Sequence, residues 1–349
     1  MTKEEIKKKL SEQKIKMAQI DPFSFCNAKC WFCPVKYKSN PKETIKHMSP
    51  DIFEKIISEM CQERDQKGIV APDFHFIYTA HYNEILLYKH FEKMCEILRK
   101  YKIKTYVLTN GIPLTQEKTD LIKKYTDVIV GICLNVPAFE QELWSKRSGM
   151  SASLFSKLIN NIKYAENQLV EFTDKKMLSL QINSATNNSF LDNGGWLTKG
   201  QDFPQDLDLN VHTGELASQH KLCKEMFPNI NVYPMPSLID RAGILDKFNI
   251  ISNKNAIDKN LKKSGDRVIG CGNGREVGGR PFGWIHVNAN ADLFLCCNDY
   301  DFEYSFGNLE KNKLNEIWIT DKHVDIIYKS FNSICTNCAS SLWNVKKGN

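Results

Sequence analysis

The chain has 349 residues, of which 42% are hydrophobic and 25% are charged, and its formal net charge is +6. This composition excludes a disordered or fibrous protein, and the length suits one large α/β domain with a smaller appendage. No apolar stretch approaches the roughly 18 residues of a membrane-spanning helix, and no signal peptide is present, so we expect a cytoplasmic protein without a membrane partner.

Residues 1–15 contain many lysines and are predicted to form a basic helix. A solvated helix face is the simplest interpretation of such a charge run. No basic stripe interleaved with aromatic residues follows it. We therefore expect no nucleic-acid partner.

Short β-rich runs then alternate with helical patterns. The helix near residue 50 should begin with Ser49 as its cap and Pro50 in its first turn, and another helical stretch surrounds residues 85–101. Strands separated by helices indicate parallel βα units, here a partial (β/α)6 TIM-like barrel over residues 16–245. A polar loop at 185–206 is a candidate lid. The predicted strands cover residues 16–23, 73–79, 103–111, 127–135, 176–184 and 229–235.

Three cysteines follow the first predicted strand, in the stretch FCNAKCWFC at residues 25–33. Clustered cysteines without an export signal indicate metal binding. Cys26, Cys30 and Cys33 are one ligand short of a zinc site or a four-cysteine iron–sulfur site. Zinc with a distant histidine is one alternative, and a cluster with one open iron is the other.

The spacing C-x3-C-x2-C after a first barrel strand resembles the signature of the radical S-adenosylmethionine (radical SAM) superfamily. The resemblance implies that Cys26, Cys30 and Cys33 hold a 4Fe-4S cluster whose open iron binds S-adenosylmethionine. It also implies reductive cleavage of this cofactor to methionine and a 5′-deoxyadenosyl radical, which abstracts a hydrogen atom from the substrate.

Further positions match the family in chain order, and the resemblance implies that they bind the cofactor. Phe32 stands where the family keeps an aromatic residue beside the adenine. The stretch HYNEI at 81–85 replaces a Gly-Gly-Glu-Pro-like turn and retains only its glutamate, and Cys133 replaces a serine. Taken singly, Glu84 could cap a helix and Asn110 could belong to an ordinary turn. The implied cofactor-binding residues are Phe32, Asn83, Glu84, Asn110 and Cys133.

The character of the sequence changes after residue 245, and a second domain is expected over residues 246–349. A polar linker leads to a hairpin at 282–296 and then to helices. This part resembles the SPASM or Twitch extension of radical SAM enzymes, a small α+β domain. The resemblance implies one auxiliary 4Fe-4S cluster, with Cys297 as the alternative to Cys296 and a four-cysteine zinc site as the competing interpretation. The implied ligands are Cys271, Cys296, Cys335 and Cys338.

The resemblance implies two 4Fe-4S clusters, S-adenosylmethionine and a reductant such as flavodoxin or ferredoxin. It favours oxidation of an alcohol-bearing small molecule, such as a sugar or cyclitol, with the auxiliary cluster as electron acceptor. The hydroxyl proton then needs an acceptor. Peptide modification is an alternative, and so is a non-catalytic metal-binding or electron-transfer protein. The candidate catalytic residues are Arg241, Tyr78 and His81, together with Arg280.

Overall fold

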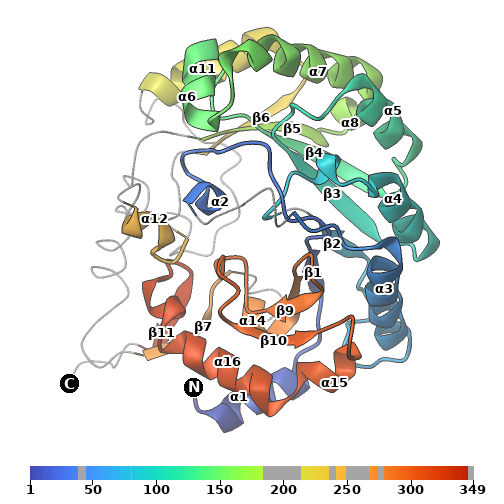
Figure 1. Cartoon of the computed structure of the whole chain (residues 1–349), viewed down its shortest axis with the longest axis vertical. Coiled ribbons are helices and arrows are strands. Elements are labelled where there is room, and N and C mark those ends of the chain that lie inside the picture. Colours follow the sequence, from blue (N-terminus) through green and yellow to red (C-terminus); the bar gives the residue numbers. More distant parts are fainter. Residues whose placement is uncertain are drawn as a thin grey trace.

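The fold is built on one curved sheet of nine strands (Figure 1). The computed structural model describes residues 1–37, 45–79, 81–183, 214–235, 241–248, 267–273 and 279–344. The loop predicted at 185–206 lies outside these residues. The first six strands form a parallel series of five pairings in chain order, which confirms the predicted α/β class. They are β1 (Met17–Ile20), β2 (Phe76–Tyr78), β3 (Lys104–Thr109), β4 (Ile129–Asn135), β5 (Leu178–Asn183) and β6 (Asn231–Met235).

Helices cover the outer side of these strands (Figure 1). The helix over Pro50–Asp65 begins as predicted, because the Ser49 hydroxyl accepts the Ile52 N–H at 3.2 Å and Pro50 occupies the first turn. Within the described part of the chain, no helix is both long and apolar enough to span a bilayer. The helices between the strands are α2 (Pro34–Tyr37), α3 (Pro50–Asp65), α4 (Phe91–Lys100), α5 (Gln116–Lys124), α6 (Gln141–Ser148), α7 (Phe155–Gln168), α8 (Val170–Asp174) and α11 (Gly214–Met226), with the 3-10 turns η2 (Ile85–Leu87) and η3 (Ala152–Leu154).

The helix predicted around residues 85–101 is divided into η2 and α4. Tyr88 between them has an extended backbone, with φ −65° and ψ 119°. Its ring is buried, and its hydroxyl donates to the Met48 carbonyl at 2.6 Å. Tertiary packing of one tyrosine therefore interrupts a pattern that looked continuously helical.

The two faces of the sheet differ in burial. Ile77 and Val107 face the helices and are fully buried. Tyr78 and Tyr106 alternate with them along the same strands, face the inner side and are only partly buried. Packing closes the outer face, whereas the inner face stays partly accessible.

The C-terminal part of the chain continues the same sheet. The first strand of the predicted hairpin, β8 (Trp284–Val287), pairs in parallel with β1, so that His286 lies opposite Gln19. Strands β9 (Asp292–Phe294) and β10 (Ser305–Asn308) extend the sheet in antiparallel fashion. The domain boundary near residue 245 stays a prediction, but strands from both sides of it share one sheet.

Short elements complete this part of the chain. A separate two-stranded sheet pairs β7 (Arg267–Cys271) with β11 (Ser341–Asn344). The remaining helices are α12 (Ile244–Lys247), α14 (Arg280–Gly283), α15 (Leu314–Trp318), α16 (Asp321–Phe331) and the 3-10 turn η6 (Ile334–Asn337).

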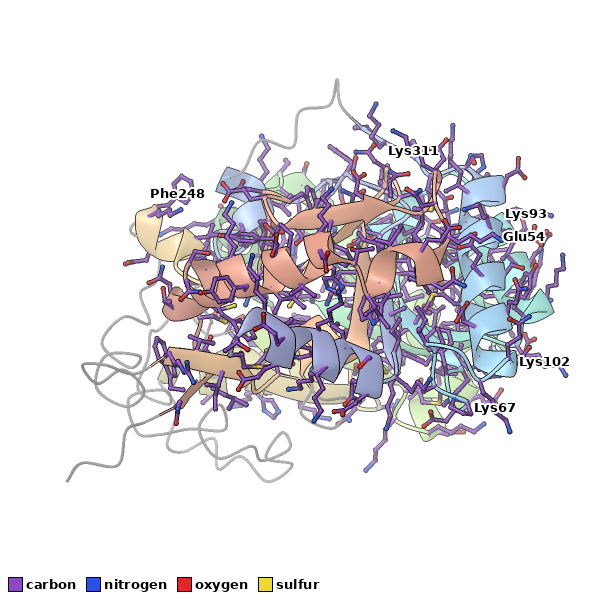
Figure 2. All side chains as sticks on the ribbon, turned by 90° about the horizontal axis from the view of Figure 1, so that it is seen from below. Glu54, Lys67, Lys93, Lys102, Phe248 and Lys311 are labelled. Carbon is purple, nitrogen blue, oxygen red and sulfur yellow. The ribbon has the colours of Figure 1, made fainter. Side chains whose placement is uncertain are left out.

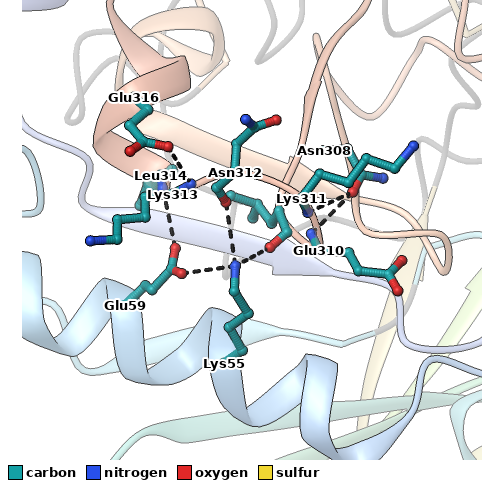
Figure 3. A network of polar contacts seen from close by, with 10 residues as sticks. Lys55, Glu59, Asn308, Glu310, Lys311, Asn312, Lys313, Leu314 and Glu316 are labelled. Atoms are coloured by element: carbon teal, nitrogen blue, oxygen red, sulfur yellow. Dashed lines mark hydrogen bonds and ion pairs between the residues drawn. The ribbon is translucent and has the colours of Figure 1, made fainter.

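A polar network joins α3 to the segment before α15 (Figure 3). The Lys55 ammonium donates to the Leu309 carbonyl and, at 3.3 Å, to the Asn312 carbonyl, and it pairs with Glu59 at 2.9 Å. Glu59 also accepts the Leu314 N–H at 3.1 Å, at the start of α15. These contacts fix the C-terminal part against the barrel.

The N-terminal helix α1 (Lys3–Glu12) lies beside α16 (Figure 1). Two of its lysines form ion pairs with α16, Lys3 with Asp325 at 2.6 Å and Lys7 with Asp321 at 2.8 Å. Lys67 and Lys102 point outward from the turns after α3 and α4, at the right-hand edge of Figure 2. The predicted basic helix therefore exists and packs against the C-terminal part.

Candidate active site

The front cysteine loop, residues 26–33, begins shortly after β1 and is held by the turn that ends α6. The Lys29 N–H donates to the Ser148 carbonyl at 2.8 Å, and the Trp31 N–H donates to the Arg147 carbonyl at 3.0 Å. Gly149 has φ 67°, and a β-carbon there would lie 2.8 Å from the Lys29 carbonyl oxygen. Glycine is needed at this position because any side chain would push the cysteine loop away.

Asn110 joins this loop to the end of β3. Its side-chain amide donates to the Asn27 Oδ1 at 2.8 Å and lies 3.9 Å from the Cys26 Sγ. Its backbone N–H donates to the Glu84 carboxylate at 2.7 Å. The structure therefore brings together Glu84, Asn110 and Cys26, three residues that were predicted from motifs far apart in the chain.

Burial controls the protonation of these groups. It raises the pKa of the Cys26 thiol to about 12, and the nearby Glu84 charge adds to this shift. It also raises the pKa of Glu84 to about 7, against the opposing hydrogen bond from Asn110. A thiol in this setting is a thiolate only when a positive centre compensates for the burial, as a bound metal does.

Asp21, at the end of β1, is a site residue that the motif analysis missed. One carboxylate oxygen accepts the His81 N–H at 2.7 Å and the Asn83 amide at 2.9 Å, and the other accepts the Gln19 amide at 3.1 Å. Asp21 is 1% exposed, and burial raises its pKa to about 7. A polar residue that ends an apolar strand just before the cysteine loop was the available signal. Through Asp21, the loop after β2 is fixed to the strand that carries the cysteines.

Two other predicted cofactor residues make different contacts. The Phe32 ring is half-buried and packs edge-on against Trp31, with centroids 5.9 Å apart. The Cys133 thiol lies 3.8 Å from the Gln181 side-chain oxygen on the neighbouring strand. Burial raises the pKa of Cys133 to about 11, so the thiol stays protonated there. Their roles toward the cofactor stay predictions.

The rear cysteines come from segments far apart in the chain and gather near η6. Burial raises the pKa of Cys338 to about 12, and the nearby Cys271 adds to the shift. Burial likewise raises the pKa of Cys335, with further contributions from Cys338 and Cys271. The pKa of Cys296 is raised by burial and then by Cys297, Cys335 and Cys338. Each of the five thiols therefore interacts electrostatically with at least two of the others, and the choice between Cys296 and Cys297 stays open.

Hydrogen bonds to the sulfurs support a ligand role for the rear set. The Asn298 amide donates to the Cys338 Sγ at 3.4 Å. Among the described residues, no three His, Cys, Asp or Glu side chains are gathered tightly enough to hold a single metal ion. The sulfur ligands of a four-iron cluster are farther apart than those of a single metal ion. Thiols that interact electrostatically but are too far apart to bind one ion are therefore compatible with such a cluster.

A buried layer of polar and aromatic residues lies between the two cysteine sets. Burial raises the pKa of Cys33 and the Arg241 guanidinium opposes this shift, whereas Tyr300 and then Cys297 raise the pKa of Arg241 against the effect of its burial. The His81 Nε2 donates to the Cys297 carbonyl at 2.6 Å, and burial lowers the pKa of His81 to about 3. Tyr82 packs against Tyr300 with centroids 4.7 Å apart. Two of the predicted catalytic residues, Arg241 and His81, thus lie between front and rear.

Tyr78, the third predicted catalytic residue, faces the inner side of the sheet. Its ring stacks on Trp284, with centroids 5.7 Å and planes 11° apart. Trp284 in turn stacks on His286, two residues further along β8. The sequence analysis did not single out Trp284 or His286, although the alternating stretch WIHV was a signal for an inward-facing pair.

Two family models match the chain. The model described as the radical SAM superfamily matches residues 20–174, and the model of the SPASM iron–sulfur cluster-binding domain matches residues 279–339. The first range contains the front cysteines, and the second contains Cys296, Cys335 and Cys338, whereas Cys271 precedes it. The predicted cofactors, S-adenosylmethionine and two 4Fe-4S clusters, follow from these two domains. No curated protein matches the chain.

Several solved structures have a similar fold. BtrN in complex with AdoMet and 2-DOIA is 16% identical, with 94% of this chain and 92% of that chain covered and a TM-score of 0.50. Streptococcus suis SuiB bound to S-adenosylmethionine is 13% identical, covering 93% and 71%, with a TM-score of 0.54. The structure of anSMEcpe with bound AdoMet and Kp18Cys peptide is 15% identical, with 93% of this chain and 89% of that chain covered and a TM-score of 0.54. At these identities the likeness shows the fold alone, and it confirms the TIM-like barrel followed by a SPASM domain.

Proposed function

Because this chain carries a radical SAM domain followed by a SPASM iron–sulfur domain, we propose that it is a radical SAM oxidoreductase acting on an alcohol-bearing small molecule. Oxidation of an alcohol to a carbonyl removes one hydrogen atom, one proton and one electron from the substrate. When bound, the front cluster with S-adenosylmethionine supplies the radical that accepts the hydrogen atom, and the rear cluster supplies the electron acceptor.

The observation that supports this proposal is the chain of contacts between the two cysteine sets, in which His81 donates to Asp21 through its backbone N–H and to the Cys297 carbonyl through Nε2. Arg241 acts electrostatically on Cys33, and Cys297 acts on Arg241. Tyr82 follows β2 near the front loop, and its hydroxyl donates to the Asp299 carbonyl at 3.2 Å, just after the rear cysteine pair. A substrate bound in this layer would lie between the residues that would hold the hydrogen-abstracting cofactor and those that would hold the electron-accepting cluster.

The chain's own residues divide the remaining work. Cys26, Cys30 and Cys33 hold the front cluster, and Asn110 and Glu84 orient the loop that carries them. Arg241 has no acceptor atom and stays protonated, so it orients a substrate oxygen but cannot take the hydroxyl proton. His81 is neutral and uses Nε2 as a donor, which leaves Nδ1 as its accepting atom. Tyr78, on the inner face of the sheet, is the third candidate catalytic residue.

The proposal is tested with anaerobically reconstituted protein, dithionite and S-adenosylmethionine. We expect 5′-deoxyadenosine, measured by liquid chromatography and mass spectrometry, and more of it when a metabolite extract is added. Absence of 5′-deoxyadenosine, with zinc as the only bound metal, would leave the non-catalytic metal-binding alternative. Stimulation by a peptide fraction and not by metabolites would favour the peptide-modifying alternative. The proposal includes a cytoplasmic location and a flavodoxin- or ferredoxin-type reductant.

A further inference from the structure

Five buried nitrogen atoms without hydrogen-bond partners lie together beside the inner face. They are the Arg280 Nε and Nη1, the Trp284 Nε1 and both ring nitrogens of His286, and none has a partner among the described residues. The Arg280 guanidinium lies over the Trp284 ring, 4.1 Å from its centroid. The Trp284 and His286 rings are stacked with centroids 5.9 Å apart. The three side chains therefore form one contiguous group.

This group differs from ordinary core packing. Trp284 is 8% exposed and His286 is 1% exposed, and a buried donor without an acceptor destabilises a fold. Of the thirteen buried side-chain nitrogen and oxygen atoms without a hydrogen-bond partner in the described residues, five belong to these three side chains. Nor does any acidic side chain in the described ranges form an ion pair with Arg280. Among the described residues, a positive charge and several N–H donors thus lack hydrogen-bond acceptors at one place.

The group borders the accessible side of the sheet. Tyr78 stacks on Trp284 and is itself partly exposed on the inner face. His286 lies opposite Gln19, whose amide is engaged by Asp21. Through Tyr78, this group of side chains therefore adjoins the partly accessible inner face of the sheet.

We propose that Arg280, Trp284 and His286 form a subsite that binds a carboxylate group of the substrate. A guanidinium fork matches the two oxygens of a carboxylate, and the indole and imidazole N–H groups supply further donors. This inference rests on the proposed function and deepens it, because it makes the substrate a hydroxy acid and not a neutral sugar or cyclitol. The subsite would hold the acid group while the alcohol carbon lies nearer the front loop.

Acetate tests the subsite, because it is small enough to enter any carboxylate site. The line width of [13C]acetate is titrated against reconstituted protein under anaerobic conditions, with acetamide as the neutral isostere. We expect saturable broadening for acetate only. Arg280→Gln should weaken acetate binding at least about tenfold, and Arg280→Lys should restore it only partly, since an ammonium cannot donate as a fork. Trp284→Phe should retain the stacking and still weaken binding severalfold, because it removes one donor.

Arg99→Gln is the matched control, because Arg99 is an exposed arginine that pairs with Asp127 at 2.5 Å. It should bind acetate as the wild type does. Equal binding by wild type and Arg280→Gln would overturn the subsite. Displacement of bound acetate by inorganic phosphate at lower concentrations than by unlabelled acetate would also overturn it. A third contrary result is an Arg280→Gln variant in which the spectrum of the rear cluster changes but acetate binding does not. Wild-type protein that forms 5′-deoxyadenosine but does not bind acetate refutes the subsite alone. Acetate binding without 5′-deoxyadenosine refutes the proposed function alone.

Discussion

The front and rear cysteine sets are built in opposite ways. The front loop is one short stretch of chain, held from outside by backbone hydrogen bonds to the Arg147 and Ser148 carbonyls and by the Asn110 side chain. The rear set draws on β7, the turn after β9 and the segment around η6, and tertiary packing alone brings these segments together.

The positions of the cysteine side chains are therefore determined in two different ways. In the front loop, the short sequence spacing keeps the three cysteines close together, and contacts with neighbouring loops fix the orientation of the loop. In the rear, the packing of β8, β9 and α16 decides whether the cysteines meet at all. Substitutions in the front loop should therefore reduce cofactor cleavage. Substitutions around the rear cysteines should first impair the formation of the rear cluster site.

The contrast is tested most severely by removing one cysteine from each set. Cys30→Ala should lower 5′-deoxyadenosine formation at least about a hundredfold, because a two-thiol loop cannot hold the cofactor's cluster. Cys335→Ala should retain part of this cleavage and lose the oxidised product. Cys61→Ala, which removes a buried cysteine from α3, should match the wild type. Wild-type cleavage by Cys30→Ala would show that the front loop is not the cofactor site.

A buried carboxyl sharpens the contrast, because Asp21 directly follows the strand that leads to the front cysteine loop. Its pKa rises from 3.8 to about 7 on folding, so the folded state binds the proton more tightly and loses stability as the pH rises across that range. Between pH 5 and pH 7.5 the Asp21 share of this loss should be on the order of 2 to 4 kcal/mol. Asp21→Asn should flatten the decline when thermal unfolding is followed by circular dichroism, whereas the exposed Asp120→Asn should not. An unchanged slope in Asp21→Asn would contradict this account.

Two glycines allow a matched test of backbone fit. Gly149→Ala places a β-carbon 2.8 Å from the Lys29 carbonyl oxygen at φ 67°, whereas Gly270→Ala meets only the Leu342 side chain, at 3.5 Å. The first should cost about 1–3 kcal/mol of stability and reduce iron bound by the front loop, and the second should cost well under that. Melting temperature and iron content give the readouts. Equal effects of the two substitutions would mean that α6 does not support the loop.

The smallest effect is expected at the contact between barrel and C-terminal part. Lys55→Met removes the donor shared by the Leu309 and Asn312 carbonyls, but the Lys55 side chain is 38% exposed. We expect a loss of about 0.5–1.5 kcal/mol and faster amide hydrogen exchange over residues 309–314. Lys93→Met, at an exposed pair with Glu96, is the control and should leave exchange in that segment unchanged.

Local patterns were sufficient to predict the strand order of the barrel and the front cysteine loop. The six parallel strands follow from apolar runs between helices, and the spacing of Cys26, Cys30 and Cys33 is legible without any tertiary information. The cap of α3 at Ser49 was likewise a local signal, and the structure confirms it.

What the sequence did not predict depends on contacts between distant residues. Asp21 is one carboxylate among many until the structure shows that His81, Asn83 and Gln19 all donate to it. Trp284 and His286 look like core residues until β8 is seen to pair with β1 and both face inward. Pairing partners in a sheet are set by long-range packing, which a local pattern does not encode.

The pairing of β1 with β8 also has a consequence for the order of events in the cell. Strand β1 ends at Ile20, yet its neighbour on one side is complete only at Val287. During synthesis the ribosome therefore delivers the cysteine loop long before the sheet edge beside it can form, and such distant pairings are slow to close. The turn at Ser148 and Gly149 and the Asn110 side chain, which hold the loop, are made before β8, so the loop can reach these supports while one side of β1 is still unpaired.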